Sequence, residues 1–287
     1  MSAHPVQEAA FMTDTSDNVI NNITNLAAEI PNGAKLAVFK DNVPMALARA
    51  LIRKNSKNLH MIGVPTSGLF ADMLIGAGCV KTMESSGVTM SEYGQAPCFV
   101  RAVQSGAIQL LDSTCPAVYT GLQAAEKGIP FMPIRGLLGS DILANRPDYK
   151  IIDNPYAVAD PIVAIPALQP DVAVFHVPLA DRHGNVWTGG QHELKLMAHA
   201  ARATLVTCER LYDGNLLADA QLAAATISAF YITAISIVEH GCWPLALPGY
   251  YPADEAAIRV YMHSAQNAAG MRNWLDEHVC ESESVVG

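Results

Sequence analysis

Asp181, His183 and Asn185 bring a carboxylate, an imidazole and an amide together around Gly184, directly after an apolar run. These residue types fit a metal or triad cluster, a turn that ends a strand, or the rim of a binding cleft. A triad needs the carboxylate behind the imidazole, a geometry that two residues only two positions apart rarely reach. We therefore expect a turn in which Asp181 bonds to local amides and Gly184 or Asn185 is left-handed. His183 is a weaker candidate for acid or base chemistry, a role for which histidine is the residue type most often used.

A second group of candidate residues begins at Arg135 and continues through GLLGSD (136–141). Gly136 and Gly139 permit close approach of the backbone to a ligand. Ser140, with Asp141 as an alternative, could cap a following helix whose amides face an anion. Arg135 could hold a carboxylate in a bidentate pair, and a surface salt bridge is the alternative.

Ser67 stands in GVPTSG (63–68), whose spacing differs from the G-x-S-x-G turn of serine hydrolases. We expect Ser67 to cap the next helix, with a ligand contact as the alternative. HELKLMAH (192–199) begins like a zinc-protease helix, but its histidines are seven positions apart instead of four. His192 and His199 are therefore expected to be exposed or capping, and no metal site is predicted. GAGCVK (76–81) lacks the third glycine of a dinucleotide-binding turn.

The elements that must position these residues follow from alternating apolar runs and amphipathic stretches. Strands are predicted at 35–40, 58–65, 79–84, 107–112, 131–135, 161–168, 171–180 and 204–211, and helices at 20–30, 44–54, 67–78, 97–106, 115–128 and 193–202. This alternation predicts an α/β fold, a Rossmann-like, mostly parallel sheet with helices on both faces. The turn at Asp181 then lies at the carboxyl ends of the strands, where open α/β sheets bind ligands.

Three segments fall outside this alternation. Residues 137–160 are rich in Gly, Asn, Asp and Pro and are expected to make a long excursion over the surface. The uncharged segment 220–238 is diluted by Gln, Ser, Thr and Ala, so it is interpreted as interior helix and strand and not as a membrane span. One or two covering helices are expected after Asp254.

The composition excludes several classes of protein. The chain has 287 residues, 16% of them charged, and a net charge of -9, which argues against a sequence-independent grip on nucleic acid. Six cysteines without a C-x-x-C pair indicate free thiols in a reducing cytoplasm. The first residues lack the basic and apolar regions of a signal peptide, so we expect a cytoplasmic protein that does not bind membranes.

Several blocks, in order and spacing, resemble one family over residues 33 to 270. The blocks are GAKLAVFKDNVPMALARAL, CVKTMESSG, SGAIQLLD, GLQAAEKGIPFMPIRGLLGSDI, DVAVFHVPLADRHGNVW and TLVTCERLYD. Together they resemble the A (alpha) subunit of family I coenzyme A transferases of the glutaconate type, within the CoA-transferase/NagB-like superfamily. The resemblance implies an arm and helix at 1–32 followed by one α/β domain at 33–287.

The resemblance also implies chemistry and a partner, the B (beta) subunit. In this family a glutamate of that partner attacks an acyl-CoA and carries CoA as a thioester to a carboxylic acid, so no catalytic residue is expected in this chain. The substrate is a coenzyme A thioester, and neither a bound cofactor nor a metal is implied. The residues expected to bind substrate are Ser67, Arg135, Gly136, Gly139, Ser140, Asp181 and Asn185.

Departures from the family pattern leave alternatives open. The turn at 37–44 lacks the glycines that the family often places there. A related branch of ring-opening CoA-thioester hydrolases carries an acidic residue where this chain has Ser113, Thr114 and Cys115, although Arg135 matches that branch. The alternatives are therefore a subunit of such a hydrolase and a noncatalytic ligand-binding relative. If the chain acted alone, Glu84 would be the candidate nucleophile, but Glu84 and Glu209 are both expected to be structural.

Overall fold

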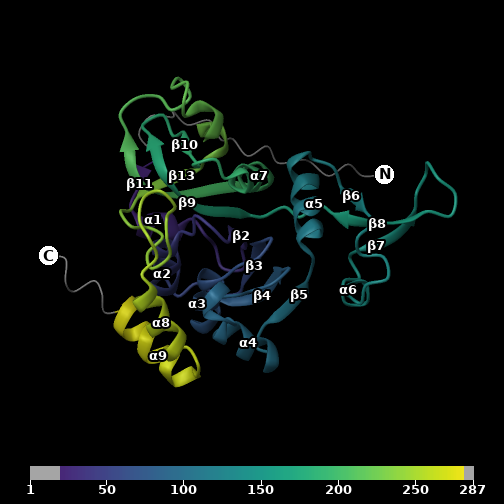
Figure 1. The fold of residues 1–287 in the computed structure, drawn as a ribbon, viewed down its shortest axis with the longest axis horizontal. Coiled ribbons are helices and arrows are strands. Elements are labelled where there is room, and N and C mark those ends of the chain that lie inside the picture. The colour runs from purple at the N-terminus through teal and green to yellow at the C-terminus, as the bar shows by residue number, and fades with distance from the viewer. Residues whose placement is uncertain (1–19, 281–287) are drawn as a thin grey trace, which may run out of the picture.

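The computed structural model describes residues 20–280, and its centre is a ten-stranded sheet (Figure 1). Eight of its strands are parallel neighbours, in the order β1 (Ile20–Asn21), β13 (Ala234–Ile237), β11 (Ala203–Tyr212), β9 (Val172–Asp181), β2 (Lys35–Phe39), β3 (Leu59–Val64), β4 (Val80–Ser85) and β5 (Gln109–Asp112). The short strands β10 (Val186–Trp187) and β12 (Thr226–Ile227) join antiparallel beside β9. Because the eight strands are parallel, all their following loops lie at one edge.

Helices cover both faces of this sheet, as the sequence predicts. The helices on the first face are α1 (Ile23–Ala28), α2 (Met45–Arg53), α3 (Leu69–Gly76), α4 (Pro97–Gln104), α8 (Glu255–Ser264) and α9 (Ala268–Leu275), and those on the second are α5 (Cys115–Glu126) and α7 (His192–Ala200). Alternate strand residues divide between the two cores, with Leu36 and Val38 in the first and Ala37 and Phe39 in the second. This alternation explains why the central strands β2 and β9 are almost entirely apolar.

A second, smaller sheet corrects one expectation. The segments 131–135 and 161–168 form strands, but β6 (Phe131–Ile134) and β8 (Pro161–Pro166) leave the parallel sheet and pair antiparallel with each other. The excursion between them contains a short helix, α6 (Ile142–Asn145), and β7 (Lys150–Asp153), which pairs with the other edge of β8. Prolines lie within these strands and at their ends, and proline cannot donate to a sheet ladder, which suits a short peripheral sheet better than a central parallel one.

The uncharged segment 220–238 is the second correction. Strand β13 lies within it as expected, but the rest consists of β12 and two 3₁₀ turns, η2 (Ala223–Ala225) and η3 (Ala229–Tyr231), without an α-helix. Local side-chain bonds favour these turns, since the Ser228 hydroxyl accepts from the Phe230 amide and the Thr226 hydroxyl donates to the Leu222 carbonyl. Within residues 20–280, no helix is long and apolar enough to cross a membrane.

The ends of the chain pack onto the same body. Residues 1–19, part of the expected N-terminal arm, lie outside the described residues, while β1 extends the sheet beside β13 and α1 buries Leu26 and Ala27 in the first core. The boundary between arm and domain at residue 32 stays a prediction. At the other end α8 and α9 form the two expected covering helices, followed by a π-helical turn at Asp276–Cys280.

Candidate functional site

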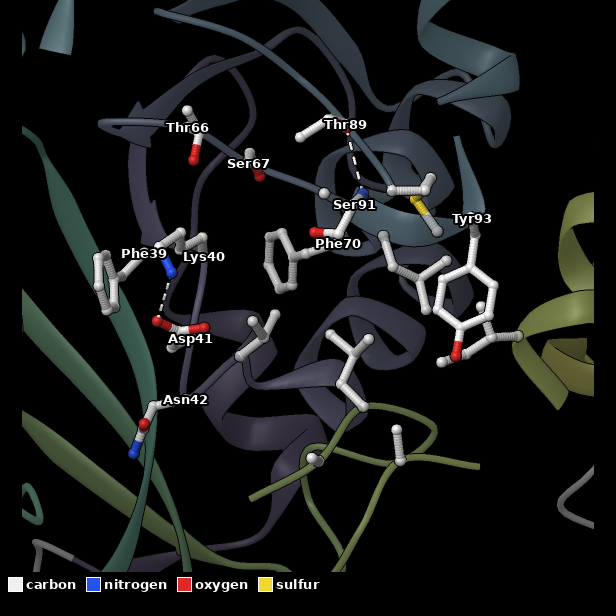
Figure 2. Close-up of a pocket in the computed structure, with 18 of the residues that line it drawn as sticks. Phe39, Lys40, Asp41, Asn42, Thr66, Ser67, Phe70, Thr89, Ser91 and Tyr93 are labelled. Carbon is white, nitrogen blue, oxygen red and sulfur yellow. Dashed lines mark hydrogen bonds and ion pairs between the residues drawn. The ribbon is translucent and has the colours of Figure 1, made fainter. Parts of the chain in front are cut away.

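A cavity of about 250 Å³ opens at the carboxyl ends of β2 and β3 (Figure 2). Four segments line it: residues 39–43 after β2, residues 66–70 after β3, residues 89–93 after β4, and part of the segment 245–258. Parallel α/β sheets bind their ligands at this edge, so the position is the one that the fold favours. Of the seven residues predicted to bind substrate, only Ser67 lines this cavity.

Ser67 does not cap the following helix, which corrects the favoured expectation. Helix α3 begins after Gly68 at the N-cap, and no side chain accepts a hydrogen bond from its first turn. Ser67 instead continues the strand edge, where its amide donates to the Gly87 carbonyl and its carbonyl accepts from the Thr89 amide. Its side chain is therefore directed into the cavity (Figure 2).

The glycine-free turn after β2 is stabilised by an asparagine. Asn42 has a φ of 53°, a left-handed conformation that asparagine tolerates better than most other side chains. It is also bonded twice to β9, since its side-chain amide donates to the His176 carbonyl at 3.0 Å and its carbonyl accepts from the His176 amide at 2.7 Å. The turn beside the cavity is thus fixed without glycine.

A buried network holds the carboxyl ends of β9 and β11. The Glu209 carboxylate accepts from the Tyr251 hydroxyl at 2.6 Å and from the His240 amide at 2.8 Å, and lies 2.7 Å from His176 Nε2. Burial raises the pKa of the Glu209 carboxyl, but the hydrogen bonds of His176 and Tyr251 outweigh it and lower that pKa to about 2. Gly241 must be glycine here, because a Cβ would lie 2.4 Å from the His176 ring. These contacts of Glu209 are internal to the chain, which supports the expected structural role.

Glu84 is held in a second buried network. Its carboxylate lies 2.7 Å from the guanidinium of Arg146 and 2.9 Å from His60 Nε2, and the Arg146 side chain is only 3% exposed. Burial raises the pKa of the Glu84 carboxyl, yet the bonds from His60 and Arg146 outweigh it, so that pKa lies below its ordinary value. Asp148 completes the pairing of Arg146. A carboxylate bound in this way is a poor nucleophile.

The turn after β9 has the predicted form. Asp181 is fully buried, and its carboxylate accepts from the amides of His183, Asn185 and Leu216 and from the Asn185 side chain, all at 2.8 to 2.9 Å. Gly184 has a φ of 86°, so it is the left-handed residue. All these bonds are internal to the chain, which supports a role in shaping the turn for Asp181 and Asn185. His183 is exposed on the turn.

Arg135 and its neighbours lie elsewhere, in the loop after β6 of the small sheet. The Arg135 guanidinium forms a bidentate pair with Asp160, and the Asp160 carboxylate also accepts from the Asn154 side chain at 2.6 Å. The alternative of a surface salt bridge is therefore the observed arrangement, with 61% of the Arg135 side chain exposed. Gly139 takes a φ of 78°, whereas Gly136 has open space around it.

The expected cap after this loop is only partly present. The Ser140 hydroxyl accepts from the Ile142 amide at 3.2 Å, while Asp141, at the N-cap, makes no side-chain bond. Helix α6 has four residues, too few to build an appreciable helix dipole. The predicted residues therefore lie in three places, the cavity, the turn after β9 and the small sheet, instead of in one site.

Of the two histidines of α7, only His192 matches the expectation of an exposed or capping side chain. His192 is exposed, and His199 lies 3.2 Å from the Glu126 carboxylate and stacks on the Tyr231 ring. Across the described residues, no group of three or more His, Cys, Asp or Glu side chains is placed to hold a metal ion.

At residues 113–115, where the resemblance to the hydrolase branch implies an acid, the chain carries neutral groups. The Ser113 hydroxyl is buried against the Tyr149 hydroxyl at 2.9 Å, Thr114 caps α5, and the exposed Cys115 thiol lies 3.1 Å from the Ser86 hydroxyl. No carboxylate therefore stands at this position of the sheet edge.

Sequence reasoning missed most of the cavity. Phe70, Thr66 and Ser91 line it together with Ser67. The loop-to-helix junction PTSGLF (65–70) could have identified Thr66 and Phe70, but it does not include Ser91. Gly63 offers one further signal, because a Cβ there would lie 2.9 Å from the Ser85 side chain and 3.2 Å from the Ser67 amide. This glycine lets the loop fold tightly back against the sheet.

Comparisons with known proteins agree with this fold. The chain is 29% identical over 248 residues to the A subunit of 3-oxoadipate CoA-transferase of Pseudomonas knackmussii, covering 84% of this chain and 85% of that protein. It is 30% identical to a cholesterol ring-cleaving hydrolase IpdA subunit of Rhodococcus jostii, covering 84% and 83%. The structure of glutaconate coenzyme A-transferase from Acidaminococcus fermentans shares the fold, with a TM-score of 0.83, 24% identity and coverage of 91% and 88%.

A family profile described as coenzyme A transferase matches residues 20–235. This range includes most of the loops around the cavity and the sheet strands β1 to β5, β9, β11 and the start of β13. The resemblance seen in the sequence blocks and the parallel α/β fold are thereby confirmed, and the chain belongs to the coenzyme A transferase family.

Proposed function

We propose that the chain is the A subunit of a heteromeric transferase that moves CoA from an acyl-CoA to a free carboxylic acid. The observation that carries the proposal is the family match over residues 20–235. A relative that is named as the A subunit of such a transferase supports the assignment of this chain to the A type. The substrates are then a coenzyme A thioester and a carboxylic acid. Six free cysteines favour a reducing compartment, the cytoplasm.

The state of the carboxylates supports a nucleophile on the partner B subunit. At the carboxyl edge of the sheet, Glu84 is paired with Arg146, Glu209 is bonded to Tyr251, and Asp181 is buried in its own turn. A nucleophile must be free to attack, and each of these groups would have to break buried bonds first. We therefore assign them to the support of the site.

The reaction then has four steps. The partner's glutamate carboxylate attacks the thioester carbonyl and releases CoA thiolate, which leaves an acyl anhydride. The thiolate attacks the glutamyl carbonyl, forms the glutamyl-CoA thioester and releases the donor acid. The acceptor carboxylate attacks this thioester and releases thiolate again. The thiolate finally attacks the acceptor carbonyl of the second anhydride and frees the glutamate.

Among the predicted substrate-binding residues, we assign direct contact to Ser67 alone. Asp181 and Asn185 shape the turn after β9, and Ser140 supports the small helix α6. Arg135, Gly136 and Gly139 belong to the small sheet, where binding of a substrate carboxylate to Arg135 would have to displace Asp160.

The test is reconstitution with the B-type subunit. The full chain and its partner together should transfer CoA between two acids and form a hydroxylamine-sensitive enzyme thioester, and the chain alone should do neither. Glu84→Gln keeps the size and part of the hydrogen bonding of the side chain, so the assembled enzyme should retain most of its transfer rate. Transfer by the chain alone would contradict the proposal.

The hydrolase alternative has a specific observation in its favour, the 30% identity to a ring-cleaving hydrolase subunit. Against it stands the absence of a carboxylate at residues 113–115. The same reconstitution separates the two, because a hydrolase consumes thioester without an acceptor acid, whereas a transferase requires one. A noncatalytic ligand-binding relative would show no turnover with any partner tested.

A further inference from the structure

We propose that the cavity at the start of α3 binds the carboxylate group of a small aliphatic carboxylic acid. The identification of this acid as a substrate rests on the proposed function. The binding site itself rests on the geometry of the cavity alone.

The polar end of the cavity is the first turn of α3. The amides of Leu69, Phe70 and Ala71 donate to no acceptor within residues 20–280, and the N-cap residue Gly68 has no side chain to satisfy them. Free amides at a helix start attract anions, because they carry the positive end of the helix dipole. Helix α3 has eight residues, enough for this effect.

The Ser67 hydroxyl is a second, independent sign of a ligand. The residue is only 2% exposed, yet its hydroxyl makes no hydrogen bond in the described structure and points into the cavity (Figure 2). The hydroxyl opens onto the cavity, so a hydrogen-bond partner for it would have to lie there. The Thr66 and Ser91 hydroxyls, also without a bond within residues 20–280, lie at the same cavity and add two donors. A ligand with paired acceptor oxygens would satisfy these groups together.

The rest of the cavity is apolar and small. Its lining includes the side chains of Phe70, Val43, Met90, Leu245 and Ile258. These side chains suit the hydrocarbon tail of an acid, since removing methylene groups from water is favourable. The volume of about 250 Å³ lies below the roughly 300 to 1,000 Å³ of sites for drug-sized ligands. The cavity therefore fits a small acid and not a whole CoA thioester.

The charges at the cavity favour a carboxylate over a phosphate. Lys40 is the one cation among the described residues that line the cavity, and its ammonium is paired with Asp41 at 2.8 Å. Asp41 and Glu92 also line the cavity, so the lining carries more negative than positive charge. Neutral amide and hydroxyl donors can hold a single negative charge by charge-assisted bonds. A phosphate, with its second charge near neutrality, would be repelled by the two acids.

Binding of acetate, butyrate and hexanoate to the full chain, measured by isothermal titration calorimetry, tests the proposal. At least one of the acids should bind, and Ser67→Ala should weaken that binding about tenfold, the loss expected for one hydrogen bond to a charged group. Ser56→Ala is the matched control, because Ser56 is 1% exposed, also lacks a hydrogen-bond partner, and lies before β3 at the opposite edge of the sheet. It should leave the affinity unchanged.

Further arms identify the ligand chemistry. Butyramide, which has the same shape without the charge, should bind at least tenfold more weakly than butyrate, and inorganic phosphate should not compete. Thr66→Val is a second variant, expected to weaken butyrate a few-fold, and it decides the matter if Ser67→Ala does not fold. The inference is overturned if no acid binds, if amide and acid bind equally, if phosphate binds more tightly, or if the cavity variants leave the affinity unchanged.

This test is separate from that of the transfer reaction. If the chain with its B-type partner transfers CoA but no acid binds the cavity, the proposed function stands and the cavity proposal fails. If acids bind in the cavity but no transfer occurs with any partner, the binding site stands and the assignment of the acid as substrate fails.

Discussion

Glu209 shows how one buried side chain can hold three segments together. Its carboxylate joins His176 of β9, the backbone at His240 and Gly241, and the hydroxyl of Tyr251. Each bond favours the ionised form, which is why the pKa falls to about 2 despite burial. Removing the charge would therefore loosen the strand ends and the segment 240–251 at the same time.

The depressed pKa of Glu209 predicts how stability responds to acid. In an unfolded chain the pKa of a glutamate is about 4.3, so its contribution to stability is present above that pH and is lost as the pH falls toward 2. In Glu209→Gln, the free energy of unfolding should therefore be lower at pH 7 and should decline less steeply between about pH 5 and pH 3. Urea unfolding at a series of pH values measures both.

The control for this prediction is Glu239→Gln, in which an exposed glutamate nearby is changed in the same way. It should reproduce the pH profile of the parent chain. An unchanged slope in Glu209→Gln would mean that the network contributes no proton-linked stability.

At the scale of elements, the turn after β9 is the clearest case of a loop fixed by one side chain. Asp181 satisfies four donors from its own turn and from the segment at Leu216. Asp181→Ala leaves these buried donors without a partner and should lower the free energy of unfolding by about 3 kcal/mol. Urea unfolding at neutral pH gives this value, and Asp213→Ala, at an exposed position of the neighbouring loop, should change it little. Equal stability of the two variants would refute the prediction.

The elements also show how far sequence reasoning reaches. The parallel strands and both layers of helices were predictable, because short apolar runs alternate along the chain with longer stretches of helical pattern. The small sheet was misplaced, because a strand pattern does not state which sheet the strand joins. The prediction of a helix in segment 220–238 was wrong for a related reason. An uncharged composition indicates burial, but it does not indicate whether the chain forms a helix or a turn.

Side-chain partners were the least predictable feature. Arg146 lies 62 positions after Glu84, and Asp160 lies 25 after Arg135, so nothing in the local spacing announces either pair. The turn at Asp181 was predictable because its donors on His183 and Asn185 lie within four residues, whereas the bond from the Leu216 amide was not. The cavity was only partly predictable, because Ser67 and Ser91 come to line it through the pairing of Ser67 with Val88 and not through a local motif.

At the scale of the whole molecule, the two cores determine where reactive groups can meet solvent. Four of the six cysteines are buried, and burial raises the pKa of Cys79 and Cys98 to about 11 and that of Cys208 and Cys242 to about 12. The thiolate is the reactive form, so these four thiols are protected by both inaccessibility and protonation. The remaining two, Cys115 and Cys280, are exposed.

This distribution predicts the reaction of the folded chain with Ellman's reagent. At pH 8 two thiols should react rapidly in the native chain and all six in guanidinium chloride, since unfolding exposes the buried four. Cys115→Ser should lower the number of rapidly reacting thiols to one and leave the rate of the slow phase unchanged. Cys208→Ser should leave the number of rapidly reacting thiols at two. The slow phase reports opening of the cores, so a destabilised variant such as Asp181→Ala should accelerate it. Rapid reaction of more than two thiols in the native parent chain would mean that the packing of one of the two cores around its cysteines is looser than the structure shows.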